Sequence, residues 1–124
     1  MERRERLKTR ELDVYKKAFK AALRLHEYSD MWPVKTARYN STADQIQRAS
    51  KGICANLVEG LSKRGDAEQR RFLNMALGSA REVQIWAEFD VGLRYEDEAW
   101  GRAVDETYEE IARMLVGLMQ KRGT

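Results

Sequence analysis

The amino-acid sequence predicts an all-α protein, a single antiparallel up-down-up-down four-helix bundle. The chain has 124 residues, a length that suits one domain. Pro33 is the only proline, so long stretches lack the residue that most strongly breaks helices. Four segments carry apolar side chains at helical spacing, and short connectors join them. We expect the bundle domain to span residues 12–122, after a basic N-terminal arm over residues 1–11.

The first segment predicts a helix from Leu12 to Tyr28, which ends before Trp32 and Pro33. Its apolar residues form two adjacent stripes that together cover roughly 200°, whereas one core contact needs about 100°. One stripe comprises Val14, Ala18, Ala21 and Leu25, and the other Tyr15, Phe19, Ala22 and His26. The remaining face carries the cations Lys16, Lys17, Lys20 and Arg24.

The second helix is predicted from a cap at Ser41, with Asp44 three residues later, to about Glu59. Gly60 is expected in the left-handed conformation that ends many helices. One side of this helix is suited to the core and comprises Ile46, Ser50, Ile53, Cys54, Leu57 and Leu61. An adjoining strip of small side chains comprises Ala49, Gly52 and Asn56, where another helix could approach closely.

The third helix is predicted from Ala67 to about Gly92, with Asp66 as N-cap and Gln69 completing a capping box. Apolar residues cover nearly its whole circumference, which indicates burial on more than one side. The fourth helix is expected to start near Glu96-Asp-Glu and to end near Lys121, because acids favour a helix N-terminus and cations its C-terminus.

The first and third helices carry more apolar surface than one bundle can cover. Monomeric proteins rarely expose large apolar patches, so we expect self-association. The alternative is loose packing that leaves a few apolar side chains exposed.

We expect no catalytic residue, metal site or cofactor. His26 is the only histidine, which excludes the usual zinc and di-metal ligand sets, and Cys54 is expected to be inert packing. Two polar residues, Asn56 and Glu82, fall among apolar or small neighbours. They predict an interhelical or intersubunit hydrogen-bond network, in preference to an enzyme built between subunits around Glu82.

Charge is divided unevenly along the chain. Residues 1–64 carry 15 Lys and Arg against 8 Asp and Glu, and residues 65–124 carry 8 against 12. A basic half indicates a polyanionic partner, which is usually nucleic acid. The candidate phosphate-binding residues are Arg48, Lys51, Lys63, Arg64, Arg70 and Arg71, together with Lys16, Lys20 and Arg24.

The same cations could instead form an ordinary solvated face, and the chain would then be a protein-interaction scaffold. Aromatic residues are not expected to interleave with the cations, so reading of single-stranded bases is not predicted. With one cysteine, no apolar run long enough for a membrane span and no secretory signal, we expect a cytoplasmic protein without membrane contact.

Residues 55–60 read ANLVEG and residues 72–82 read FLNMALGSARE. With VYKKA at 14–18, Trp32-Pro33 and YEDE at 95–98, they make the chain resemble the bacterial four-helix bundle proteins encoded in intervening sequences of large-subunit rRNA genes. The resemblance covers about residues 12–122. The residues that match its motif are Asn56, Glu59, Gly60, Gly78, Ser79 and Glu82.

The resemblance implies a ring-like homopentamer. It also implies kinship with the accessory protein of diversity-generating retroelements, which binds a reverse transcriptase and nucleic acid through a basic surface. Arg48, Lys63, Arg64 and Arg71 stand where the family commonly has basic residues. The chain departs from the pattern at Gly52 and Cys54, where Ser and Pro are common, and at Arg81, where a small or apolar residue is common.

Overall fold

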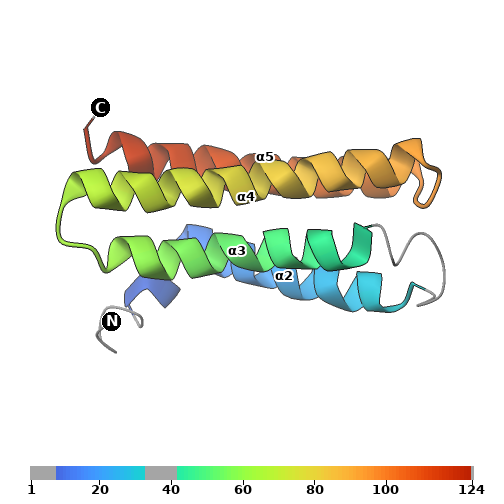
Figure 1. Cartoon of the computed structure of the whole chain (residues 1–124), viewed down its shortest axis with the longest axis horizontal. Coiled ribbons are helices and arrows are strands. Elements are labelled where there is room, and N and C mark those ends of the chain that lie inside the picture. Colours follow the sequence, from blue (N-terminus) through green and yellow to red (C-terminus); the bar gives the residue numbers. More distant parts are fainter. Residues whose placement is uncertain (1–7, 33–41, 124) are drawn as a thin grey trace.

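A computed structural model describes residues 8–32 and 42–123 of the chain and confirms an all-α bundle with four main helices (Figure 1). The helices are α2 (Asp13–Asp30), α3 (Asp44–Leu61), α4 (Asp66–Gly92) and α5 (Glu98–Gln120). Each runs antiparallel to the one before it. The expected cap at Ser41, Pro33 and most of the predicted basic arm lie outside the described residues.

The helices pack in the order in which the chain visits them. The contact between α3 and α4 is the most extensive, followed by that between α4 and α5 and then that between α2 and α3, while α2 and α5 meet over a smaller area that closes the bundle. A cleft of about 190 Å³ follows this last seam, between Leu25 and Tyr28 of α2 and Trp100 and Val104 of α5. The start of α2, the α3–α4 connector and the end of α5 lie at the same end of the bundle (Figure 1).

The core consists of the apolar stripes that helical spacing predicts. Each helix buries residues three and four positions apart, which removes their apolar surface from water. The fully buried side chains on three of the helices include Ile46, Ile53, Leu57, Leu73, Val83, Ile111 and Leu115. On α2 the buried apolar residues are Val14, Ala18, Ala21 and Leu25, as the first of its two stripes predicts, together with Ala22 of the second stripe.

Two of the predicted helix ends are wrong. Gly60 does not end its helix in a left-handed conformation, because α3 continues through Leu61 and the only described glycine with positive φ is Gly123. Gly60 is needed for packing: a Cβ there would lie 2.4 Å from the Cβ of Phe72. Asp66 is also not an N-cap, because α4 already includes it and follows the extended residue Gly65.

The predicted capping box at the start of α4 is therefore absent. The Gln69 side chain donates instead to the carbonyl oxygen of Lys63 at 2.7 Å, which ties the connector to the first turn of α4. The acidic start expected for the last helix is confirmed. Asp97 is its N-cap, and its carboxylate accepts a hydrogen bond from the Trp100 amide at 2.8 Å.

Helix α4 buries one stripe inside the bundle but leaves other apolar side chains in solvent. Met75, Ile85, Phe89 and Leu93 are each about half exposed. On α2, Phe19 and Leu23 are about half exposed too, and Met31, which follows the helix, is more exposed. A single copy of the chain therefore does not cover the apolar excess that the sequence places on these two helices.

Candidate nucleic-acid interface

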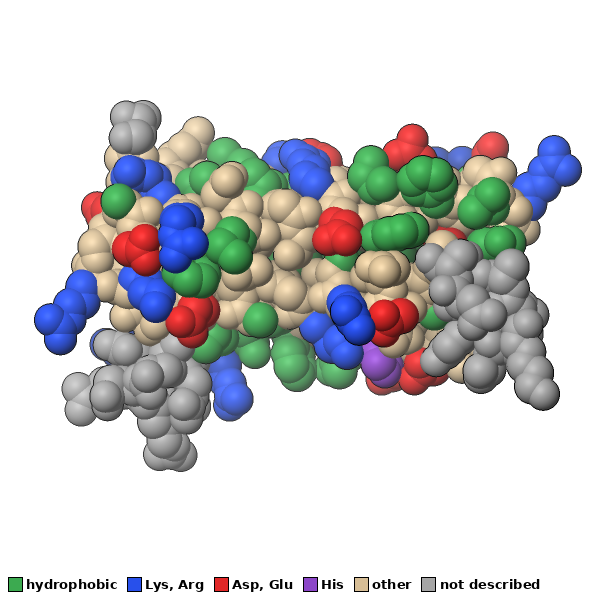
Figure 2. Space-filling view, in the orientation of Figure 1, with side chains coloured by type: hydrophobic (Ala, Val, Ile, Leu, Met, Phe, Trp, Pro, Cys, Tyr) green, Lys and Arg blue, Asp and Glu red, His purple; other side chains and the backbone are tan. Residues whose placement is uncertain are grey.

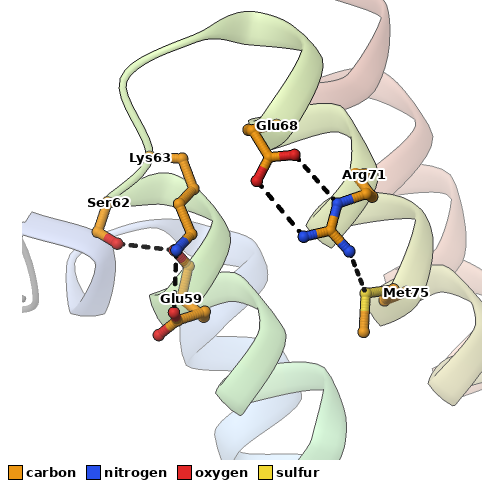
Figure 3. A network of polar contacts seen from close by, with 6 residues as sticks. All are labelled: Glu59, Ser62, Lys63, Glu68, Arg71 and Met75. Atoms are coloured by element: carbon orange, nitrogen blue, oxygen red, sulfur yellow. Dashed lines mark hydrogen bonds and ion pairs between the residues drawn. The ribbon is translucent and has the colours of Figure 1, made fainter.

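Two of the predicted phosphate-binding residues, Lys63 and Arg71, lie at the corner where α3 passes into α4 (Figure 3). The Lys63 ammonium lies 3.1 Å from the Glu59 carboxylate, and the Arg71 guanidinium 3.1 Å from the Glu68 carboxylate. The ring of Phe72 lies beneath both cations, at 5.2 Å from Lys63 Nζ and 4.6 Å from Arg71 Cζ. These contacts fix the direction of both side chains.

The corner is less basic than the sequence suggests, because each of these cations has an acidic partner. The Arg71 guanidinium lowers the pKa of the Glu68 carboxyl through a hydrogen bond and its charge, and Glu68 raises the pKa of Arg71 in return. Arg64 is exposed and has no carboxylate partner among the described residues. Of the cations at the corner, Arg64 therefore keeps its charge uncompensated.

Arg70 has a different surrounding from its neighbour Arg71. Its guanidinium is half-buried and donates a hydrogen bond to the Arg122 carbonyl, just past the end of α5. The Arg122 side chain in turn donates to Gln69 Oε1 at 2.6 Å and to the Leu118 carbonyl at 2.7 Å. Arg70 and Arg122 thus satisfy carbonyl groups at the C-terminal end of α5 and fasten it to the start of α4.

The other two predicted residues of α3 lie away from the corner. Arg48 pairs with Asp44 at 3.1 Å, one turn earlier on the same helix. Lys51 is exposed and precedes the end of α3 by ten residues, or about 15 Å of helix. The structure therefore does not bring all the predicted cations of α3 and α4 into one surface.

On α2, by contrast, the predicted cations form one continuous ridge. Lys16, Lys20 and Arg24 follow one another at four-residue intervals and are all exposed. Within the described part of the chain, none of the three forms a salt bridge. An external anion can therefore bind these three cations without breaking an existing ion pair.

A groove of about 950 Å³ runs beside this ridge, between the first half of α2 and the last part of α5. Lys17 crosses it and pairs with Glu110 of α5 at 2.9 Å. The lining also contains Met114 and further side chains of α2 and the segment before it. These are Arg10, Asp13, Tyr15, Lys16, Phe19 and Lys20.

The expectation that aromatic residues do not interleave with the cations is wrong for this groove. Tyr15 and Phe19 stack on each other, with ring centroids 5.9 Å apart and an angle of 17° between the planes. Both line the groove together with Lys16 and Lys20. The signal was present in the sequence, because each aromatic immediately precedes a lysine and the two pairs are one helical turn apart.

The outer face of α4 carries a second feature, a row of exposed and mostly apolar residues. Met75, Gly78, Glu82, Ile85 and Phe89 follow one another at alternating intervals of three and four residues, and all are exposed. This is the spacing of a coiled-coil seam. Figure 2 shows hydrophobic side chains gathered over the C-terminal half of α4.

The two polar residues expected to join helices bond within their own helices instead. The Asn56 amide donates to the Gly52 carbonyl at 3.0 Å, and the Trp86 indole N–H donates to the Glu82 carboxylate at 3.3 Å. An interhelical network through either residue is therefore absent from the described protomer. Glu82 is exposed in the middle of the α4 seam, so its expected role between subunits stays a prediction.

Two of the motif residues, Gly60 and Ser79, lie where α3 and α4 pack against each other. Gly60 leaves room for Phe72, and a Cβ at Gly52 would lie 3.0 Å from the Ser79 hydroxyl oxygen. Glu59 serves the corner through its pair with Lys63. Gly78 is different, because a Cβ there would meet nothing within 4 Å. Packing inside the protomer thus explains Gly60 and Ser79 but leaves Gly78 unexplained.

The described residues offer little for covalent or metal chemistry. Burial raises the pKa of the Cys54 thiol to about 11, which disfavours the reactive thiolate. Burial also raises the pKa of the nearby Tyr108 hydroxyl, which lies against Ser50 and Cys54. No group of three or more His, Cys, Asp or Glu side chains in residues 8–32 and 42–123 is arranged to hold a metal ion. Over the same residues, none of the helices is both long and apolar enough to cross a membrane.

Comparison with known proteins supports the bundle and places the chain in a family. No curated protein sequence matches it. A solved structure from Bacteroides thetaiotaomicron, described as a protein with unknown function from the S23 ribosomal protein family, superposes with a TM-score of 0.78. The two share 24% identity over 86% of this chain and 97% of the other, which supports the fold alone. The model of the 23S rRNA-intervening sequence proteins matches residues 10–117, so the chain belongs to this family.

Proposed function

We propose that the protein is a non-enzymatic, self-associating accessory protein that binds nucleic acid, RNA foremost, through the basic ridge of α2. The observation that carries this proposal is the ridge itself: Lys16, Lys20 and Arg24 are exposed, aligned and unpaired among the described residues. Phosphate groups are bound by such clusters, and release of counterions from the nucleic acid supplies the affinity. Membership of the 23S rRNA-intervening sequence protein family agrees with RNA as the partner.

The cations at the α3–α4 corner are a secondary contact in this proposal. Lys63 and Arg71 pair with acids at the surface, and such ion pairs are worth only about 0–1 kcal/mol each. A polyanion can therefore replace the acidic partners at small cost. The corner and the start of α2 lie at the same end of the bundle, so one extended nucleic acid can reach both (Figure 1).

Self-association is proposed through the seam on α4. A helix of a second copy would cover Met75, Ile85 and Phe89 and remove their apolar surface from water. Glu82 would lie in the middle of this contact, where a polar residue fixes the register of two helices. The resemblance suggests that five copies close into a ring. It also suggests a reverse transcriptase as a further protein partner.

Binding of labelled RNA, measured by fluorescence anisotropy from low to physiological salt, tests the proposal. The variant Lys16→Glu/Lys20→Glu should bind at least tenfold more weakly, and its affinity should depend less steeply on salt, because about two phosphate contacts are lost. Arg102→Glu/Arg113→Glu is the matched control. It makes the same change in net charge, at two exposed positions of α5 that pair only with acids of their own helix.

If both variants weaken binding equally, net charge alone is responsible and the ridge is not the site. If the unchanged protein fails to bind RNA even at low salt, the nucleic-acid proposal is excluded. The α4 seam would then favour the second candidate function, a protein-interaction scaffold without affinity for nucleic acid, because the seam needs no polyanion to act.

A further inference from the structure

The groove between α2 and α5 combines an exposed aromatic surface with unpaired cations. Tyr15 packs against the hydrophobic core with part of its ring, and Phe19 stacks on it at a centroid distance of 5.9 Å. Phe19 remains 47% exposed, so part of its ring faces solvent. Tyr15 thus holds Phe19 in place while leaving an aromatic surface open in the groove.

Cations line the same groove as this aromatic surface. Lys16 and Lys20 each follow one of the two rings and lie one helical turn apart, about 6 Å along the axis. Arg10 lines the same groove from the segment before α2. Two acids are present as well, but Glu110 is already engaged by Lys17, which leaves Asp13 against Arg10, Lys16 and Lys20. The groove therefore attracts anions.

We infer that this groove binds single-stranded nucleic acid, with an unpaired base stacked on Phe19 and the neighbouring phosphates held by Lys16 and Lys20. The inference rests on the proposed function and specifies which class of nucleic acid the α2 ridge takes. Aromatic rings beside a basic groove are the usual means of binding single strands, because every base has a face that can stack. In a duplex the base faces are covered by their neighbours, so only the cations can act on it.

The cations beside its aromatic rings distinguish this groove from the apolar seam on α4. No aromatic residue of the seam is followed by a cation, whereas each ring of the groove is followed by a lysine. A partner helix from a second copy could occupy this groove only by supplying acids to meet Lys16 and Lys20, because burial of unpaired charges is costly. A strand with alternating flat bases and phosphates fits both kinds of group at once.

The test compares single-stranded RNA, single-stranded DNA and a duplex of the same length by fluorescence anisotropy. Phe19→Ala should weaken binding of both single strands about tenfold, the size expected for loss of one stacked base, and leave the duplex within twofold. Phe19→Trp should restore single-strand binding, and its added indole fluorescence should be quenched when the strand binds. Leu23→Ala is the matched control, because Leu23 is 48% exposed on the next turn of the same helix.

Three results would overturn the inference. One is a Phe19→Ala variant that binds single strands as well as the unchanged protein. Another is equal weakening of single-stranded and duplex binding by that substitution. The third is a fall in the mass of the Phe19→Ala protein measured by light scattering, which would assign Phe19 to contact between copies. Failure of the proposed function is a separate result, since the unchanged protein would then bind neither single strands nor duplex.

Discussion

Gly60 of α3 and Phe72 of α4 approach so closely that a side chain on Gly60 would collide with the Cβ atom of Phe72. A Cβ at Gly60 would lie 2.4 Å from Phe72 Cβ, far inside normal contact distance. Phe72 Cβ is fixed by the backbone of α4 and cannot move aside as the end of a flexible chain would. The same phenylalanine ring lies beneath Lys63 and Arg71, so this contact also positions the basic corner.

Gly60→Ala should therefore destabilise the protein. Overpacking of this kind costs about 1–3 kcal/mol, and the better helix propensity of alanine offsets about 1 kcal/mol of it. The net loss should appear as a lower midpoint in urea unfolding followed by circular dichroism. Gly78→Ala is the control, because its Cβ enters open space and should raise protomer stability by up to about 1 kcal/mol. Equal stability of the two variants would show that helices α3 and α4 separate easily at Gly60.

The seam on α4 predicts that self-association can be abolished without unfolding the protomer. Ile85→Glu/Phe89→Glu places two carboxylates among exposed apolar residues, which makes burial against a second copy costly. We expect light scattering to show a smaller particle, with the helical circular dichroism unchanged. Asn74→Glu, at an exposed position of α4 outside the seam, should leave the mass as it is. A micromolar monomer for the unchanged protein would contradict the seam's proposed role.

The bundle could be predicted from the sequence because its signal is local. The intervals between apolar residues give both the existence of each helix and the face that it buries, as Val14, Ala18 and Leu25 show on α2. Gly60 could not be assigned correctly in this way. Glycine at the end of an apolar pattern usually indicates a left-handed cap, and only the position of α4 shows that packing against Phe72 requires it instead.

The candidate interface was less predictable, because a count of cations does not reveal their partners. Arg70 and Arg71 are adjacent in the sequence, yet one donates to the Arg122 carbonyl and the other pairs with Glu68. The partner of Arg70 lies 52 residues away, so no short-range pattern could identify it. The groove of Tyr15 and Phe19 likewise depends on α5, whose Glu110 engages Lys17 and leaves Lys16 and Lys20 unpaired.

Arg70 and the α2 lysines should thus respond differently to substitution. Arg70→Ala removes a donor from a half-buried carbonyl and should lower the free energy of unfolding by about 1 kcal/mol. Its effect on RNA affinity and on the salt dependence of binding should be small, because the guanidinium already serves the end of α5. The measurement pairs urea unfolding with anisotropy on one protein preparation, and Lys20→Ala should show the reverse pattern. A loss of RNA affinity in Arg70→Ala as large as that in Lys20→Ala would place Arg70 in the interface after all.

Cys54 gives a prediction about pH. Burial raises the pKa of its thiol from the ordinary value of 9.0 to about 11, so the unfolded chain ionises before the folded one does. The contribution of the Cys54 thiol to the free energy of unfolding is fully present below about pH 9. It is lost as the pH rises from there to about 11, because thiolate formation favours the unfolded state. The Tyr108 hydroxyl, whose pKa burial also raises, acts in the same direction at higher pH.

Alkylation by iodoacetamide measures this shift directly. At pH 8 the native thiol should react roughly a hundredfold more slowly than the same thiol in urea, since two pKa units reduce the thiolate fraction by that factor. Cys54→Ala should lose stability less steeply between pH 9 and 11 than the unchanged protein, and Tyr108 should account for what remains. Fast alkylation of the native protein at pH 8 would mean that the thiolate forms readily. It would also remove the argument that this cysteine is inert packing between α3 and α5.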